Sequence, residues 1–267
     1  MKSTHLKSHV KIKEQPNLNN SSKSFSKVTE ATYYNACEIE AELLKLFGYP
    51  IEYSASRFVS LIKACNVSII SLLHVSEDGF LKTLDFSPTN EQQIIDILTG
   101  GERADGSSLF PNGGIKAESS DIVLKPRLRS AFFDPFSPVK KSVLCFFCWH
   151  YATDGSLLPQ SPETILHHVE EKLKRSHQCL WAHGEIEYFI GKELNVRNSE
   201  KDLCVSDVGE DRGYHASAPF VFGQSLRREA ISILTRIGVL VKYGHSECGL
   251  ISATKEDPTT WEQHEVR

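Results

Sequence analysis

The chain has 267 residues, of which 40% are hydrophobic and 24% are charged, and its formal net charge at pH 7 is −4. A chain of this length can bury a substantial core and accommodates one large or two ordinary domains. The slightly negative charge excludes a general nucleic-acid binder, and no apolar run approaches the ~20 residues of a membrane helix. We therefore expect a soluble globular protein that binds neither nucleic acid nor membrane.

The seven cysteines are scattered through apolar segments, and no secretory hydrophobic region precedes them. An odd number in that distribution argues against a disulfide framework and favours a cytoplasmic location. Cys145 and Cys148 have the spacing of one half of a zinc knuckle, but they lie inside the apolar run SVLCFFCWHYA without a second pair. A buried strand is the better interpretation of that run.

Residues 1–26 are rich in Ser, Asn and Lys and have no apolar period, so they predict a disordered basic tail. The turn Ser76–Gly79 between two apolar runs is typical of a hairpin. The elements predicted around it are helices at 29–47 and from 56, strands at 67–75 and 80–86, and a helix at 88–98. This order predicts a small α+β domain.

Residues 102–126 are dense in Gly, Ser, Asp and Pro and predict one long loop, which in a compact domain is usually functional or disordered. A strand at 142–152, a helix opening at Ser161, a helix at 224–237 and a strand at 239–243 are predicted next. Helical spacing predicts two buried stripes, one of Ile165, Leu166, Val169 and Leu173, the other of Leu226, Ala230, Ile233, Leu234 and Ile237.

The stretch Cys179–Gly191, CLWAHGEIEYFIG, predicts a strand. Successive side chains of a strand point to opposite faces, so Glu185 and Glu187 share a face with His183 while Tyr188 takes the other. A solvent-facing edge strand would carry two carboxylates at little cost. The apolar flanks favour a buried strand instead, where neighbouring carboxylates repel unless a cation or proton intervenes. A hard cation ligated by oxygen would resolve this conflict.

The order of several motifs resembles the glutamine synthetase family, and most closely its bacterial and archaeal type one. The matches span about 165 residues, which makes them far more specific than a lone Glu-x-Glu. In chain order they are RADGSSLFPNGGIKAESSDIVLKP, FDPF at 133–136, TDG at 153–155, SPETILHHVEEKL, GEIEYF, GYHASAP at 213–219, LRREAISILTRIGV, GHSE and QHEV at 263–266.

The resemblance implies an α+β protein in which a β-grasp domain precedes a truncated α/β catalytic domain. It places the tail at 1–26, the β-grasp domain at 27–155 and the first half of the catalytic domain at 156–267. Members of the family join ammonia to glutamate at the expense of ATP, through γ-glutamyl phosphate. They form homo-oligomeric rings whose active sites lie between adjacent subunits, so glutamate, ammonia, ATP and further subunits are the expected partners.

By motif matching, Glu187, Glu247 and Glu265 would ligate one Mg²⁺ or Mn²⁺ near glutamate, and Glu185 would ligate a second near the ATP phosphates. Glu187 and Glu247 are also the matched substrate-binding positions. Phosphoryl transfer depends on cations that neutralise charge between carboxylate and phosphate oxygens, and this explains why clustered Glu side chains would be tolerated. The matches assign neither a catalytic residue nor a nucleotide contact.

Two departures qualify the resemblance. Glu265 lies 18 positions after Glu247, which is a longer spacing than in the family, so Glu265 reaches the metal only if the inserted residues loop out. The chain also stops at Arg267, where the family's later segments have no counterpart. We expect the first metal site to be complete and the C-terminal half of the catalytic domain to be missing.

Three functions are therefore open. The first is a glutamine synthetase chain whose active site is completed by a further copy or by a polypeptide carrying the missing half. The second is a catalytically inactive remnant or regulatory binding module of the same fold. The third is a ligase of the same superfamily that joins glutamate to an amine other than ammonia.

Overall fold

The structure is a computed structural model that describes residues 6–14, 37–192, 214–219, 221, 223–247 and 260–266, with only the backbone described in parts of these ranges. Backbone contacts divide the chain into two compact units. The first holds residues 37–179, and the second holds the later described residues together with the N-terminal strand as far as Lys13. The predicted domain division after residue 155 stays a prediction.

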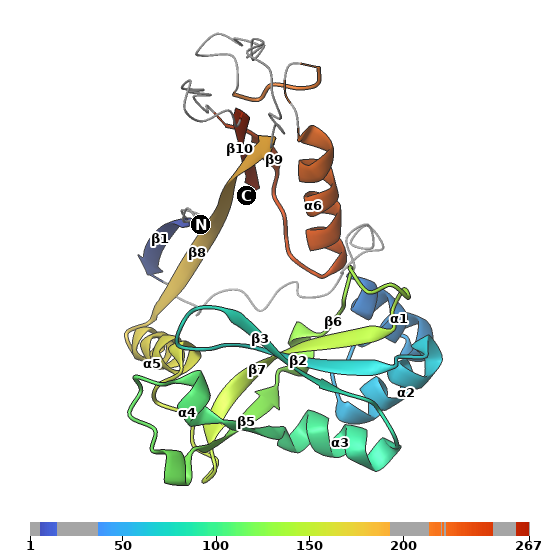
Figure 1. Cartoon of the computed structure of the whole chain (residues 1–267), viewed down its shortest axis with the longest axis vertical. Coiled ribbons are helices and arrows are strands. Elements are labelled where there is room, and N and C mark those ends of the chain that lie inside the picture. The colour runs from blue at the N-terminus through green and yellow to red at the C-terminus, as the bar shows by residue number, and fades with distance from the viewer. Residues whose placement is uncertain are drawn as a thin grey trace, which may run out of the picture. The chain divides into compact units, whose positions relative to one another are not determined.

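The first unit contains a mixed sheet of six strands in the order β3-β2-β7-β5-β4, with β6 paired to β7 (Figure 1). The hairpin of β2 and β3 is antiparallel, as predicted, whereas β2 runs parallel to β7. The strands are β2 (Ile69–Val75), β3 (Leu81–Phe86), β4 (Glu102–Asp105), β5 (Asp121–Pro126), β6 (Phe132–Phe133) and β7 (Val143–Ala152).

Polar caps begin three of the helices of this unit, α2, α3 and α4. The side chain of Ser54 accepts from the backbone N–H of Arg57, and that of Asn90 accepts from the N–H of Gln93, so each satisfies one orphan donor of a first turn. The helices are α1 (Glu38–Phe47), α2 (Ala55–Cys65), α3 (Glu91–Gly100), α4 (Gly106–Leu109) and α5 (Pro162–Arg175), with 3₁₀ turns η2 (Ala117–Ser119) and η3 (Leu128–Ser130).

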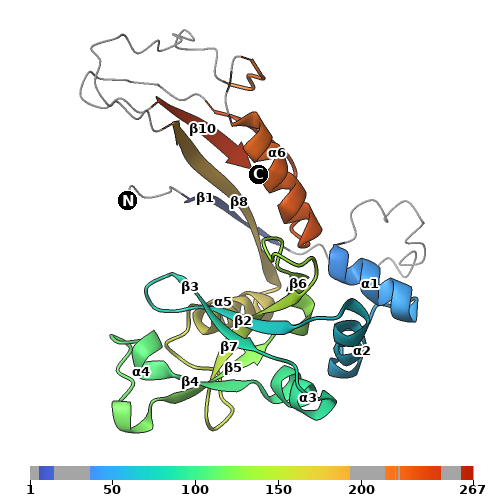
Figure 2. The ribbon, with the colours of Figure 1, turned by 45° about the vertical axis from the view of Figure 1, so that its right-hand side comes forward.

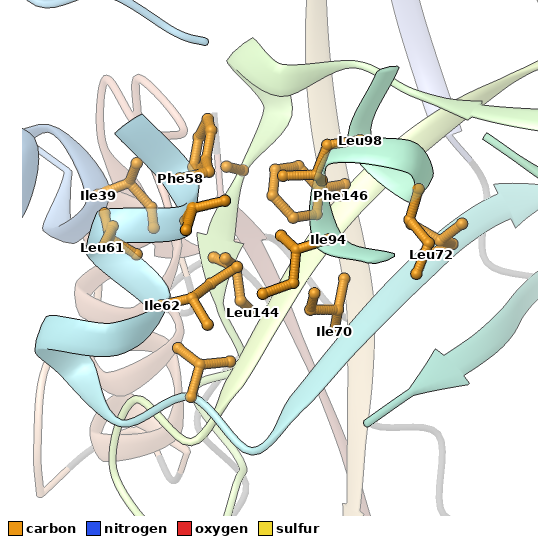
Figure 3. Packing of buried hydrophobic residues seen from close by; sticks show 14 of the residues in the cluster. Ile39, Phe58, Leu61, Ile62, Ile70, Leu72, Ile94, Leu98, Leu144 and Phe146 are labelled. Carbon is orange, nitrogen blue, oxygen red and sulfur yellow. The ribbon is translucent and has the colours of Figure 1, made fainter. Parts of the chain in front are cut away.

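Helices α1, α2 and α3 pack on the sheet to form the main core, part of which is drawn in Figure 3. Phe58 of α2 meets Phe146 of β7 edge to face, with ring centroids 5.1 Å apart. Leu144 on the same strand is fully buried. Burial of a side chain of this size contributes about 1.5–3 kcal/mol. The apolar run of β7 and the apolar stripes of the three helices are therefore what hold this unit together.

The predicted single loop at 102–126 is wrong, because this segment contains β4, α4, η2 and β5. Its polar residues mark tight turns between short elements. Gly101, at φ +83°, is required by the close approach of β5, since a Cβ there would lie 2.4 Å from the carbonyl oxygen of Leu124. Strands of this length carry too little periodicity to be recognised before their partners are known.

The buried stripe predicted for α5 is also wrong. Ile165, Leu166 and Val169 are 59%, 51% and 45% exposed, whereas Thr164 on the other side of the helix is buried. The amphipathic pattern identified an apolar face correctly but could not say which face meets the sheet. The polar residues at the start of the helix decide that, because they pack against a buried histidine of β7.

The second unit contains strands in the order β1-β8-β10-β9 and helix α6 (Figures 1 and 2). The long strand predicted around the Glu-x-Glu pair is confirmed as β8. The elements are β1 (Leu6–Glu14), β8 (Gln178–Lys192), α6 (Gln224–Arg236), β9 (Gly244–Ser246) and β10 (Thr260–Val266).

Three predictions for this unit need correction. Residues 6–14 of the predicted disordered tail form β1, which pairs with the edge of β8, while 1–5 and 15–26 lie outside the described residues. The predicted strand at 239–243 is absent: the backbone N–H of Val239 donates to the carbonyl of Leu234 in α6, that of Val241 donates to Val239, and β9 begins only at Gly244. On α6 itself Leu226 is 49% exposed and Arg227 is buried in its place.

Within the described residues, none of the helices has both the length and the apolar character needed to cross a bilayer.

Candidate metal centre

Strand register in the second unit brings together positions that are far apart in the sequence. Glu265 of β10 pairs with Glu187 of β8 on one side and with His245 of β9 on the other. Residues directly opposite one another in an antiparallel ladder share a face of the sheet, as do residues two apart on one strand. Glu185 and Glu247 lie two positions from members of this row. The four predicted metal ligands are thus neighbours by backbone placement.

Burial shows that the Glu-x-Glu pair is not a solvent-facing feature. Glu185 is 3% exposed and Glu187 is 9% exposed, whereas Ile186 between them is 46% exposed. The carboxylates therefore occupy the covered face of β8, which excludes the solvent-facing edge strand for these residues. The side chain of Glu247 is 21% exposed. Buried carboxylates are tolerated only when they are paired, protonated or bound to a cation.

The donor chemistry of these positions suits a hard divalent cation, since Mg²⁺ and Mn²⁺ prefer carboxylate oxygens. No group of three or more His, Cys, Asp or Glu residues is arranged to hold a metal within the part of the chain whose side chains are described. For Glu265 only the backbone is described. The complete ligand set of Glu185, Glu187, Glu247 and Glu265 thus stays a prediction.

A pocket of about 500 Å³ adjoins the row at His245. Its wall contains three adjacent aromatic rings: Tyr214 stacks on His215 with ring centroids 4.2 Å apart, and His215 meets His245 at a tilt with centroids 4.4 Å apart. Arg227 of α6 also lines the pocket and is only 6% exposed. Flat rings beside a buried guanidinium can hold a planar or anionic group.

The backbone around His245 is held by two neighbouring chain segments. The ring Nδ1 donates to the carbonyl of Ser246 at 3.0 Å and lies 3.6 Å from Oε1 of Glu247. The hydroxyl of Ser246 in turn donates to the carbonyl of Ala216. The backbone N–H of His215 donates to the carbonyl of Ser246. These contacts set the position of the residues that line the pocket. Because a carbonyl only accepts, Nδ1 of His245 carries a proton.

Sequence reasoning assigned no role to the residues of this pocket. Two signals were present: the match of GYHASAP, which includes Tyr214 and His215, and an arginine within the first turn of an otherwise apolar helix stripe. Neither signal shows which side of α6 is covered. The burial of Arg227 becomes evident only from the packing of α6 on β9 and β10.

In the first unit the matched Asp-Gly-Ser-Ser loop forms a compact acidic turn. Asp105 accepts hydrogen bonds from the hydroxyls of Ser108 and Ser107 at 2.6 and 2.7 Å, and from the N–H of Ser107 at 3.0 Å. These bonds hold the pKa of its carboxyl well below the usual range. The loop thus presents an ionised carboxylate on the surface.

The paired cysteines of β7 are confirmed as part of a buried strand. Cys145 and Cys148 are 5% and 2% exposed, and burial raises the pKa of each thiol to about 12. Zinc binds thiolates and needs further ligands nearby. Such thiols are poor metal ligands and poor nucleophiles.

No family model matches the chain, but individual proteins do. Glutamine synthetase of Methanococcus maripaludis is 31% identical over 191 residues, which cover 70% of this chain and 41% of that protein. Glutamine synthetase of Clostridium saccharobutylicum is 24% identical over 196 residues, which cover 73% and 42%.

Solved structures support the fold. The Plasmodium falciparum glutamine synthetase structure superposes with a TM-score of 0.55 at 16% identity, over 80% of this chain and 43% of that one. GmaS in complex with ADP superposes with a TM-score of 0.54 at 13% identity, over 77% and 43%. The chain thus has an α+β fold that matches part of the glutamine synthetase structures.

The chain spans about 41% of the length of the Methanococcus glutamine synthetases to which it is similar. Over about 70% of its own length, the chain is thus similar to part of the glutamine synthetases.

Proposed function

We propose that the covered face of β8, β10 and β9 binds a divalent cation and that the chain serves glutamine synthetase-type ligation of ammonia to glutamate. The observation that carries this proposal is the register in which Glu187, Glu265 and His245 form one row across three strands. Three segments separated in the sequence contribute to that row. Similarity to the glutamine synthetases supplies the reaction class.

Each carboxylate has a role in this proposal. Glu187, Glu247 and Glu265 hold Mg²⁺ or Mn²⁺ near glutamate, with Glu187 and Glu247 also contacting the substrate, and Glu185 holds a second ion near the phosphates of ATP. Cations held there would supply positive charge between carboxylate and phosphate oxygens. The protein's part is to keep the glutamates buried and oriented, so that they are in place before the substrates arrive.

The proposal includes the organisation that the family shares. The first unit, with its hairpin, helix and parallel return strand, serves as a β-grasp domain, and the second as part of a catalytic domain. The chain represents about 41% of the length of its relatives, and in this proposal the active site also uses residues from outside that part or from further copies of this chain. The second candidate is a binding or regulatory module that retains the metal site without turnover.

Manganese binding by the purified chain tests the metal site. Glu187→Gln removes one carboxylate charge and one ligand at nearly constant size, and it is expected to weaken Mn²⁺ binding by about tenfold or more. Calorimetry or paramagnetic NMR relaxation measures the affinity. Glu170→Gln, on the exposed side of α5 in the other unit, is the matched control and should bind as the parent does. Equal affinity of both variants would remove Glu187 from the site.

Glutamine formation separates the two candidate functions. Incubated with glutamate, ammonia, ATP and Mg²⁺, the chain alone is expected to form no glutamine, because a large part of the family's length is not represented in it. Activity restored by a polypeptide that supplies the rest of that length supports the ligase. Persistent inactivity with intact Mn²⁺ binding supports the binding module, and product formed only with another amine supports a different ligase.

A further inference from the structure

The segment that follows α4 in the first unit forms an exposed turn that is not part of the candidate metal centre. The backbone N–H of Gly113 donates to the carbonyl of Phe110 at 3.0 Å, which closes a β-turn of residues 110–113. Phe110 is 1% exposed and packs with Ile122 and Leu158 in a small apolar cluster, whereas Asn112 at the tip is exposed. The turn is therefore anchored at its start and open to solvent at Asn112.

Backbone groups attach this turn to two neighbouring segments. Oε2 of Glu77, in the turn between β2 and β3, accepts from the backbone N–H of Asn112 at 2.9 Å. The backbone N–H of Glu77 also donates to the carbonyl of Leu109 at 3.1 Å. On the other side, Nε2 of Gln160 donates to the carbonyl of Gly113 at 3.0 Å. The link from the tip of the turn to the hairpin thus depends on the carboxylate of Glu77, which is itself exposed.

Asn112 combines an unoccupied side-chain amide with a glycine directly after it. Within the described part of the chain, only the backbone of Asn112 takes part in hydrogen bonds. Asn112 and Gly113 form the only Asn–Gly pair in the sequence. Because glycine has no Cβ, the backbone nitrogen of Gly113 can approach the side-chain carbonyl carbon of Asn112 with little steric hindrance. This pair is therefore the most reactive asparagine linkage of the chain.

The other two asparagines of the described ranges lack this combination. The side chain of Asn90 caps α3 by accepting from the N–H of Gln93 at 2.9 Å, and the residue after it is Glu91. Asn66 is followed by β-branched Val67, whose N–H donates to the carbonyl of Ile62 at 2.9 Å. A side chain on the following residue hinders the approach of its nitrogen. Asn66 and Asn90 thus serve as internal comparisons.

We propose that Asn112 is a site of spontaneous deamidation and that the carboxylate formed there loosens the attachment of this turn to the β2–β3 hairpin. The backbone nitrogen of Gly113 attacks the side-chain carbonyl carbon Cγ of Asn112 and gives up its proton. A bond forms between that nitrogen and Cγ, the bond from Cγ to the side-chain nitrogen breaks, and ammonia leaves with the proton. Water then adds to either carbonyl of the resulting cyclic imide, so residue 112 becomes aspartate or isoaspartate without any oxidant or reductant.

Opening of one hydrogen bond controls the first step. The nitrogen that attacks is the one that donates to the carbonyl of Phe110, so the amide of Gly113 has to leave that bond before it reacts. A bond that closes an exposed turn opens locally, without unfolding of the core. The folded chain should therefore react more slowly than the unfolded chain, but within about tenfold of its rate.

The product adds a negative charge beside existing ones. The new carboxylate belongs to the residue whose N–H the Glu77 carboxylate binds. Asp78, next to Glu77, is also ionised, because hydrogen bonds from Ser76 and Lys82 hold the pKa of its carboxyl well below the usual range. Lys82 already pairs with Asp78 at 2.9 Å. Like charges repel, so the contact between Glu77 and residue 112 should weaken after deamidation.

Mass spectrometry of the full chain, incubated in its folded state at mildly alkaline pH, tests the reaction. The tryptic peptide of residues 104–116 should gain about 1 Da as the amide becomes a carboxylate. Peptides 64–82 and 83–103, which contain Asn66 and Asn90, should stay unchanged. Asn112→Gln keeps a neutral amide but would have to form a larger ring, so its peptide should not change either. An unmodified 104–116 peptide in the folded parent, whether or not the chain reacts in urea, would overturn the proposal.

Amide hydrogen exchange tests the structural consequence. Asn112→Asp places the product carboxylate at the same position from the start. The backbone amides of residues 77 and 112, corrected for intrinsic rates, should lose about two- to fivefold in protection relative to the amides of α2, which is the size of an exposed charge interaction. Asn112→Gln should keep the protection of the parent. Equal protection in Asn112→Asp and the parent would show that the added charge loosens nothing and would overturn that part of the proposal.

Discussion

Glu185 and Glu187 are two carboxylates at alternate positions of a strand, and both are almost fully buried. Ile186 between them is exposed, so the side of β8 that is covered is the charged one. An uncompensated carboxylate in such a place would be strongly destabilising. The backbone of Glu265 lies opposite that of Glu187, and a cation shared between such positions would lessen repulsion among their carboxylates. Burial therefore makes the metal proposal more specific than the motif alone.

The thiols of β7 permit a residue-scale prediction. Because burial raises the pKa of Cys145 and Cys148 to about 12, almost no thiolate forms at pH 8, and both should resist alkylation by iodoacetamide in the folded chain. Mass spectrometry of tryptic peptides measures the modification. Cys179 is only partly buried and should react sooner. Fast labelling of Cys145 or Cys148 without denaturant would contradict their burial.

At the scale of elements, local signals and packing contribute differently. The hairpin turn, the start of α5 and the long β8 are confirmed because turn residues, an N-terminal proline and a period of two act within a few residues. The covered face of α5 was predicted wrongly, whereas that predicted for α6 fails only at Leu226. Ile165 and Leu226 are exposed while Thr164 and Arg227 are buried, since polar contacts made elsewhere in the fold set the rotation of each helix.

The cap of α3 gives the prediction at this scale. Oδ1 of Asn90 accepts from the N–H of Gln93 at 2.9 Å, and Asn90→Ala leaves that donor without its partner. The free energy of unfolding should fall by about 1 kcal/mol, within the range of ~0.5–2 found for helix caps. Chemical denaturation measures this change. Gln92→Ala, at an exposed position in the first turn of the same helix, is the control. It should change the free energy of unfolding by no more than about 0.5 kcal/mol.

For the whole molecule, the two units differ in how their stability arises. The main apolar cluster lies entirely within the first unit, between Ile39 and Cys148. The described part of the second unit contributes few fully buried apolar side chains, with Val221 as the example among its described residues. Polar and aromatic contacts among Tyr214, His215 and His245 form its other described cluster, which is partly exposed. Such a unit gains more from ligands or from a completing polypeptide than the first does.

This contrast predicts that a fragment of residues 37–179 folds by itself. Its core contains the contacts of α1, α2 and α3 with the sheet, so it should unfold cooperatively in urea with the far-ultraviolet spectrum of a mixed fold. Leu144→Ala in the fragment should reduce the free energy of unfolding by about 2–5 kcal/mol. A fragment without a cooperative transition would show that the first unit depends on the rest of the chain.

The sequence by itself determined the features that depend on neighbours along the chain. These include the alternation that puts Glu185 and Glu187 on one face, the β2–β3 turn, the apolar stripes and the motifs of the glutamine synthetase family. The tertiary structure alone decided that Glu265 stands opposite Glu187 across a long connection, that residues 6–14 pair with β8, and that α5 presents Thr164 to the sheet. The physical reason is that periodicity is a local property, whereas register and the choice of buried face depend on contacts between distant residues.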